Sequence, residues 1–325
     1  MNKTRRSLVT ATALGVTLTA LPVWAQGFPD KPVRIVVGFA AGGGTDFVAR
    51  TVSESLSKLW GQPVVVENKT GVSGMLAAEQ VVRSAPDGYT LLISPQTSIA
   101  VAPQMYAKPL YDPLKELTAI TLIASSPLVL VAHPSFPASN FKEFLAYVRQ
   151  NPGKVSFASG GNGSSPHMTA ELLNTQLDLK TVHVPYRGEQ PALVDVMGNQ
   201  VGVLFANIPS GMPFVKSGRL KALVTTGESR SPLAPDVATI SESGEARIAT
   251  ATWNALYGPA GMSPELVRKL HADVSNALKA GDARQRLEAS GNEVVVNPPE
   301  RFAEFLAGEV TRWGKVIKTA NIRVD

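Results

Sequence analysis

Short apolar runs of strand length alternate with stretches of helical apolar spacing along most of this chain, and that alternation limits the folds it can adopt. Residues 33–39, 64–66 and 89–94 are such runs. The stretch 45–60, between the first two, repeats its apolar residues every three or four positions, as a helix with one buried face does. Strands that alternate with helices are typical of parallel sheets, because the chain must return before the next parallel strand begins. The sequence therefore predicts an α/β fold.

The order of elements repeats in the second half of the chain. Glycine-rich junctions begin near residues 42 and 160, the strands after them near 64 and 181, and the next strands near 89 and 201. The residue identities at these paired places hardly match, but the order and the spacing do. The repeat predicts two half-domains with one plan.

The first glycine-rich junction, GFAAGGGTDFVAR at 38–50, lies between a strand and a helix. Ligands of open α/β sheets bind outside the carboxyl ends of the strands. Glycine lets backbone N–H groups approach a ligand closely, and the helix behind the loop presents the positive end of its dipole. One such loop is explained equally well by a tight turn. Two loops at equivalent places favour a small anion held from both sides of a cleft.

A dinucleotide is the first alternative ligand. The strand, glycine loop, helix and second strand ending in Glu67 resemble a nucleotide-binding unit. The G-x-G-x-x-G fingerprint is incomplete, because Gly42 and Gly44 are followed by Phe47 where the third glycine belongs. No GxxxxGK[ST] sequence is present either. These departures disfavour a nucleotide.

A secreted hydrolase that uses Ser164 or Ser165 with His167 is the second alternative. No GxSxG elbow supports it, since Met75 stands where the last glycine would follow Ser73. Side chains two residues apart on a helix, such as Ser165 and His167, also point in different directions and need not meet. Serine at a helix N-terminus more often caps the helix or contacts an anion. The hydrolase remains the alternative to a binding protein.

The N-terminus has the pattern of an export signal. A basic segment with Lys3, Arg5 and Arg6 precedes an apolar stretch and the sequence Val23-Trp24-Ala25, which resembles a signal-peptidase site. Residues 1–25 are therefore predicted to be a cleaved signal peptide, and the protein is predicted to be periplasmic. The paired arginines leave the general and the twin-arginine export routes both open.

Composition excludes several classes of site. The chain has no cysteine, so it has no disulfide, thiolate metal site or cysteine nucleophile. Its four histidines have no metal-ligand spacing, and neither a metal nor a cofactor is predicted. The formal net charge is +5, of which the predicted signal carries three positive charges and no acid, leaving about +2. Without a dense Lys/Arg run, a nucleic-acid partner is not expected.

Several segments of the chain resemble the Bug family, the extracytoplasmic solute receptors of tripartite tricarboxylate transporters. They are FPDKPVRIVV at 28–37, AGGGTD at 41–46 with Arg50, ENKTG at 67–71, APDGYTL at 85–91, VPYRG at 184–188 and YGPAG at 257–261. The resemblance covers essentially the whole mature chain. It implies a periplasmic-binding-protein fold of type II-like form, with two α/β domains and a ligand cleft between them. It also implies a receptor without enzymatic activity that binds a small organic acid and passes it to membrane permease subunits.

The resemblance assigns site residues by position, and it implies that the two loops grip the ligand largely through backbone amides and ordered water. Asp46 is expected to cap its helix or pair with Arg50 rather than touch an anion. Other members often carry lysine where Arg187 stands, and departures near Gln96 and Asn207 bear on which carboxylate is bound. The residues assigned to the site are Phe39, Gly42, Gly43, Gly44, Thr45, Asp46, Thr97, Gly161, Gly163, Ser164, Ser165, His167, Tyr186, Arg187 and Asn207.

The chain order predicts a split into two domains. Domain 1 comprises 26–124 plus 230–325, domain 2 comprises 125–229, and two crossings near 124 and 229 form the hinge. The apolar stripes of the helices expected at 264–279 and 299–320 are predicted to pack on domain 1. The protein is expected to be a monomer, and the sequence does not identify the bound carboxylate.

Overall fold

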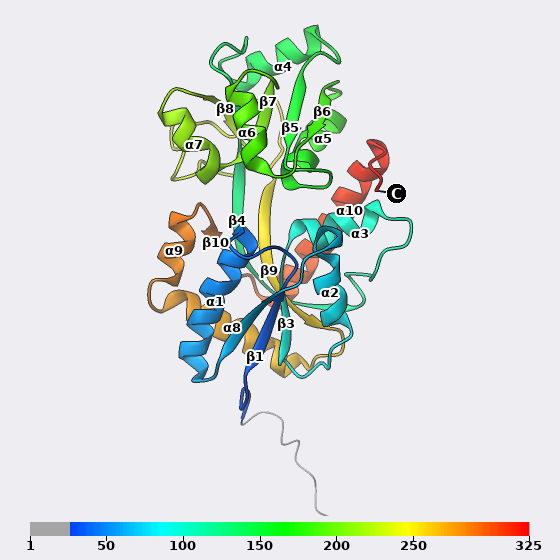
Figure 1. Ribbon diagram of the computed structural model, residues 1–325, viewed down its shortest axis with the longest axis vertical. Helices are drawn as coiled ribbons and strands as arrows, with labels where there is room; N and C mark the ends of the chain where they lie inside the picture. Colours follow the sequence, from blue (N-terminus) through cyan, green and yellow to red (C-terminus); the bar gives the residue numbers. More distant parts are fainter. Residues whose placement is uncertain (1–26, 325) are drawn as a thin grey trace, which may run out of the picture.

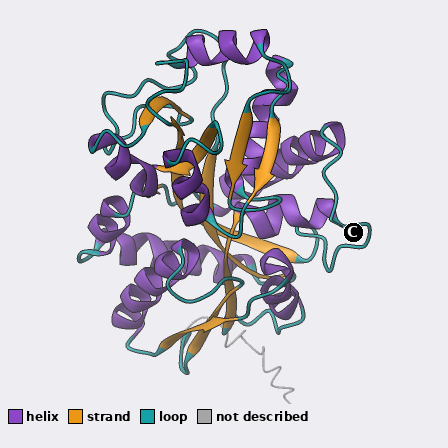
Figure 2. Ribbon diagram, turned by 45° about the horizontal axis from the view of Figure 1, so that its top comes forward, coloured by secondary structure: helices purple, strands orange, loops and turns teal. Residues whose placement is uncertain are grey.

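The computed structural model describes residues 27–324, so the predicted signal peptide lies outside the described residues. Two lobes lie one above the other along the long axis, and strands β4 and β9 run between them (Figure 1). Figure 2 shows helices on the outside of both lobes and strands within. Among the helices of residues 27–324, none is both long and apolar enough to cross a bilayer.

The first lobe is built on three parallel strands. β1 (Val33–Val37) lies between β2 (Val64–Asn68) and β3 (Thr90–Pro95). β9 (Ala251–Pro259) pairs antiparallel with β3, and the first part of β4 (Leu117–Ala132) pairs antiparallel with β9. The short β10 pairs with β4 at Ala124 and Ser125, where it covers that edge.

The second lobe repeats this arrangement. β5 (Ser156–Ser159) lies between the parallel strands β6 (Val182–Pro185) and β7 (Val203–Asn207). The last part of β4 pairs antiparallel with β7, and β8 (Lys221–Thr225) pairs with the other edge of β4. The order β6-β5-β7-β4 therefore matches β2-β1-β3-β9. This match confirms the α/β class and the repeat predicted from the sequence.

The helices follow the apolar spacing of the sequence. In α1 the residues Val48, Val52 and Leu56 are buried against β1, β3 and α8, as the pattern predicts, but Leu59, predicted on the same face, is 48% exposed at the end of the helix. Asn140 caps α4, where its side chain accepts a hydrogen bond from the N–H of Glu143. The helical segments are α1 (Gly44–Trp60), η1 (Val72–Gly74), α2 (Met75–Val82), η2 (Thr97–Val101), α3 (Ala102–Met105), α4 (Phe141–Gln150), α5 (Ser165–Leu177), α6 (Glu189–Met197), α7 (Ile208–Lys216), α8 (Pro264–Lys279), α9 (Ala283–Ala289) and α10 (Pro299–Thr319); the short strand is β10 (Glu293–Val294).

The two long C-terminal helices bury the stripes read from the sequence. Leu270, Val274 and Leu278 of α8 join the core under β1 and β3, as predicted. In α10 the stripe is buried except for Phe305, which lies edge-on to Trp253. α10 packs on η2 and β4, and it also contacts α5 of the second lobe. It therefore contributes to both lobes, although the sequence assigned it to the first.

The strand β4 changes partners where the lobes meet. Through Pro127 it pairs with β9, and from Leu128 onward it pairs with β7 and β8. Thr226 connects β4 to the residue before β9 at this point. Its N–H donates to Leu128 O, and its hydroxyl donates to Thr250 O. The boundaries near 124 and 229 remain a prediction, and these contacts favour a return crossing closer to residue 250.

Candidate functional site

The loop after β1 holds α1 with its N-terminal amides exposed. Gly42 has φ 82°, and its N–H donates to Asp46 Oδ2 at 2.8 Å. No side chain caps α1, and the first N–H bonded within the helix is that of Phe47, to Gly43 O. The N–H groups of Gly44 and Thr45 therefore precede the helical hydrogen bonds, as at any helix start. Because Gly44 is exposed and has no side chain, a ligand can approach these amides closely.

Asp46 holds the first loop from inside. Its side chain is only 2% exposed, and it accepts hydrogen bonds at 2.8 Å from Arg50 Nε and from Asn68 Nδ2. Asn68 also donates to Phe39 O at 2.9 Å and so joins the end of β2 to the loop. Burial alone would raise the pKa of Asp46, but the hydrogen bonds from Arg50, Gly42 and Asn68 outweigh it and lower the pKa to about 2. The pairing with Arg50 expected from the sequence is present, and Asp46 supports the loop as a carboxylate.

The loop after β5 repeats this construction with a neutral side chain. Gly163 has φ 75°, and its N–H donates to His167 Nδ1 at 3.0 Å. The first N–H bonded within α5 is that of Met168, to Ser164 O. Gly163 thus corresponds to Gly42, and His167 corresponds to Asp46. The sequence aligned the loop at 42 with the loop at 160. In the structure, Gly42 corresponds instead to Gly163.

His167 is kept neutral by its surroundings. It is buried and stacks on His183 at a ring distance of 3.8 Å, and His183 Nε2 lies 2.6 Å from Ser159 Oγ. Burial lowers the pKa of His167 to about 3, with a smaller contribution from His183. Since Nδ1 accepts from Gly163, the proton of the neutral ring lies on Nε2. His167 therefore supports the second loop as a hydrogen-bond acceptor.

The hydrolase alternative finds no support in this geometry. Ser164 Oγ donates to Gly161 O at 2.7 Å, which makes it part of the loop turn. Within residues 27–324, neither Ser164 nor Ser165 is hydrogen-bonded to His167. A nucleophile needs a base within hydrogen-bond reach, and a histidine with a pKa of about 3 is a weak base at neutral pH.

The remaining predicted residues lie at the carboxyl ends of their strands. Thr97 begins η2 and is partly exposed. Asn207 ends β7, where its N–H and its Nδ2 donate to the two carboxylate oxygens of Glu189 at 2.6 and 2.7 Å. Burial raises the pKa of Glu189, and the hydrogen bonds from Asn207 oppose that rise. Glu189 therefore fixes the orientation of the Asn207 amide, which keeps its second N–H and its oxygen for other partners.

Tyr186 and Arg187 follow β6 and differ in their contacts. The Tyr186 hydroxyl donates to Asp195 at 2.6 Å, so this residue is tied to α6. Arg187 is exposed and forms no salt bridge with a residue of the described chain. The Arg187 guanidinium therefore has no carboxylate partner among residues 27–324.

One contact places the second loop against the first lobe. A Cβ atom at Gly163 would lie 2.7 Å from Met105 Sδ and 3.6 Å from Val101, which end α3 and η2. The loop therefore lies against the helical segment that Thr97 begins. Between 38–46 and 160–167 the described residues form no hydrogen bond or salt bridge. The two loops face the same lobe junction without touching through polar groups.

Three supporting residues were not assigned from the sequence. Asn68 holds Asp46, His183 stacks on His167, and Glu189 holds Asn207. Asn68 stands within the ENKTG segment that carries the family resemblance, which is the only signal for it in the sequence. His183 on β6 meets His167 on α5, and Glu189 on α6 meets Asn207 at the end of β7, so each contact joins a helix to a strand and no local pattern marks it.

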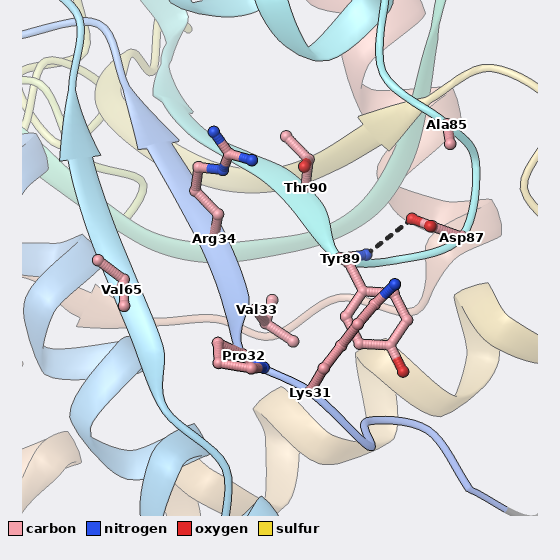
Figure 3. A pocket seen from close by; sticks show the side chains of 9 residues that line it. All are labelled: Lys31, Pro32, Val33, Arg34, Val65, Ala85, Asp87, Tyr89 and Thr90. Atoms are coloured by element: carbon pink, nitrogen blue, oxygen red, sulfur yellow. Dashed lines mark hydrogen bonds between the residues drawn. The ribbon is translucent and has the colours of Figure 1, made fainter.

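Two cavities lie away from the glycine loops. One of about 460 Å³ lies at the amino ends of β1 and β3, where Figure 3 shows Lys31 over the Tyr89 ring. Another of about 820 Å³ lies behind the strands that join the lobes, between Pro127 and Arg312. No residue assigned to the site lines either cavity.

Known proteins resemble the chain over nearly its full length. Residues 48–322 match the tripartite tricarboxylate transporter family receptor. Protein BugT of Bordetella pertussis is 31% identical over 100% of both chains, and a protein of Cupriavidus necator is 34% identical over 96% of this chain and 95% of its own.

Solved structures of similar proteins share the fold. An adipate-bound protein of R. palustris superposes with a TM-score of 0.78 at 31% identity, covering 91% of this chain and 99% of its own. MatC from Rhodopseudomonas palustris with bound malate superposes with a TM-score of 0.75 at 35% identity, covering 89% of this chain and 100% of its own. The periplasmic binding protein BugD superposes with a TM-score of 0.74 at 34% identity, covering 91% of this chain and 99% of its own. The fold is therefore that of the periplasmic solute-binding proteins, as the sequence predicted, and this chain belongs to the Bug family, the receptors of tripartite tricarboxylate transporters.

Proposed function

We propose that this receptor works in the periplasm, captures a small dicarboxylate between the β1–α1 and β5–α5 loops, and delivers it to membrane permease subunits. The observation that carries the proposal is the matched pair of helix starts, each behind a left-handed glycine whose N–H is held by an internal side chain. Relatives of the same fold hold adipate and malate, which supports a carboxylate as the ligand class.

The two loops offer different donors to the solute. The first supplies backbone N–H groups of Gly44 and Thr45 at the positive end of α1. In the second, Pro166 has no N–H, so Ser165 supplies its amide and its hydroxyl. The Ser165 hydroxyl is partly exposed and has no hydrogen-bond partner among residues 27–324. Both loops thus accept an anion without a charged side chain in contact.

Replacing Ser165 by alanine should weaken carboxylate binding at least fivefold, because a typical hydrogen bond contributes about 1 kcal/mol and one to a carboxylate contributes more. Titration calorimetry of the mature protein checks this. Ser164→Ala is the matched control for the turn itself, since that hydroxyl binds Gly161 O. Unchanged affinity in Ser165→Ala would leave its hydroxyl out of the site.

A thermal-shift screen tests the function directly. The mature protein is heated with malate, adipate, succinate, citrate and neutral solutes of similar size. A ligand at 100 times its dissociation constant stabilises by about 2.7 kcal/mol, a rise of about 4 °C for a chain of this size. Ligand recovered unchanged after incubation is expected of a receptor. No shift with any carboxylate would contradict the proposal.

We place the hinge where β4 and β9 pass between the lobes, with the predicted domains on either side. Closure can draw its free energy only from contacts made in the closed state alone. A dicarboxylate that binds both loops should therefore reduce the radius of gyration measured by solution X-ray scattering. Gly163→Val should keep the apo profile with the same ligand, since a side chain there meets Met105. Identical profiles for the wild type with and without a bound ligand would exclude ligand-driven closure.

A further inference from the structure

Four consecutive residues after β2 have positive φ angles. The φ angles at 71–74 are 133°, 47°, 53° and 85°. The outer two are glycines, but Val72 and Ser73 are not, and a β-branched residue in this region is an outlier. Left-handed residues that are not glycine usually cap a helix C-terminus, as Asp178 does after α5. Val72 and Ser73 end no helix, so helix capping does not explain their conformation.

Contacts with β1 and η2 fix this segment at the carboxyl ends of the strands. A Cβ atom at Gly38 would lie 2.6 Å from Gly74 Cα, and one at Gly74 would lie 2.9 Å from the Phe39 ring. The buried Ser98 donates its hydroxyl to Ser73 O at 2.8 Å. Segment 71–74 therefore packs between Phe39 and η2, both of which hold residues assigned to the site.

The second lobe has a counterpart to this segment. A Cβ atom at Gly160 would lie 3.4 Å from the carbonyl carbon of Gly188, so the end of β5 meets the residue before α6. The end of β1 meets Gly74, the residue before α2, in the same way. Residues 186–188 include Tyr186 and Arg187, which the sequence assigned to the site. By the repeated plan, 71–74 occupies the equivalent place on the first lobe.

The side chains of the left-handed pair are available to a ligand. Val72 is 40% exposed, although it is apolar and its backbone is strained. Ser73 is exposed, and its hydroxyl makes no hydrogen bond with any residue of 27–324. Backbone strain that a fold keeps at exposed residues is concentrated at ligand clamps and active sites.

We propose that residues 71–74 form a third wall of the solute site, on which the Ser73 hydroxyl donates to the carboxylate at the far end of a dicarboxylate. Val72 contacts the carbon chain between the two ends. This wall gives the receptor its preference for dicarboxylates over monocarboxylates of the same length. The inference rests on the proposed function of the two glycine loops.

The experiment compares two pairs of probes of matched length, adipate with hexanoate and succinate with butyrate. Titration calorimetry is run on the wild type, Ser73→Ala and Val72→Gly, with the thermal midpoint of each measured without ligand. Ser73→Ala should weaken the dicarboxylate that the wild type binds at least fivefold and leave its monocarboxylate partner unchanged. Val72→Gly should raise the midpoint by about 2 °C while weakening both members of the pair.

Asp178→Gly is the matched control, because it relieves the same backbone conformation at the far end of α5. It should leave every affinity unchanged. If Ser73→Ala and Val72→Gly keep the wild-type affinities and the wild-type ratio of dicarboxylate to monocarboxylate affinity, residues 71–74 do not form part of the site. The proposal of a site between the two loops is then unaffected. If the wild type binds none of the four probes or any other carboxylate, the proposed function itself fails, and the inference fails with it.

Discussion

Replacing Gly42 by valine should lower carboxylate affinity at least 100-fold while the protein still folds. A β-branched residue at φ 82° is strained by about 1–3 kcal/mol, and the loop relieves that strain by leaving its conformation. The Gly42 N–H then loses Asp46, and the amides of Gly44 and Thr45 turn away from the solute. A 100-fold loss corresponds to about 2.7 kcal/mol, which the misplacement of two or three hydrogen bonds supplies.

Gly61→Val provides the matched control for this prediction. Gly61 ends α1 with φ 64°, and a Cβ atom there meets no atom within 4 Å, as at Gly42. Both variants should lose similar free energy of unfolding, measured by urea denaturation, but Gly61→Val should bind the ligand normally in calorimetry. Equal affinities in the two variants would show that the β1–α1 loop does not hold the solute.

Replacing Asp46 by asparagine should cost about 2–3 kcal/mol of stability and at least tenfold in affinity. The buried carboxylate accepts hydrogen bonds from Arg50, Asn68 and Gly42 together. The NH₂ group of an asparagine in its place would face at least one of these N–H donors without forming a hydrogen bond. The loop then has no fixed geometry. Glu54→Gln on the same helix is the control, since Glu54 is half-exposed and its surface ion pairs contribute little.

The stability lost in Asp46→Asn should depend on pH. The pKa of Asp46 falls from 3.8 to about 2 in the folded protein, so its contribution is fully present above about pH 4. It is lost as the pH falls from about 4 to about 2, because over this range the unfolded chain binds the proton and the folded protein does not. Urea denaturation at pH 2.5, 4 and 6 should show the gap between wild type and variant narrowing toward low pH. A gap that stays constant over this range would show that the charge of Asp46 is not what holds the loop.

Local patterns explain why so much of the fold could be predicted from the sequence. Apolar runs, helical spacing and glycine clusters are read over a few residues, and they located β1, α1 and the two loops. The pairing of Asp46 with Arg50 was also local, one helical turn apart. The repeated order of elements predicted that the two halves share one plan, but the strand order itself was not predicted.

Contacts between elements that are separated along the chain explain what could not be predicted. Nothing near Asn207 shows that Glu189 binds its amide, and nothing near His167 shows that His183 stacks on it. The shift between the two loops arises because Gly160 directly follows β5 and so corresponds to Gly38, which directly follows β1, rather than to Gly42. Both loops contain several glycines, and the residue pattern alone does not show which of them are equivalent.

The strand β4 has a consequence for how this protein can be recombined. One continuous strand completes the first sheet through Pro127 and the second from Leu128, so either lobe cut out alone would expose an unpaired strand edge. Proteins whose domains are connected by loops can exchange those domains as independent modules. Here a chimera that takes its second lobe from a relative must be joined within β4, between Pro127 and Leu128, so the junction lies inside a continuous strand rather than in a loop.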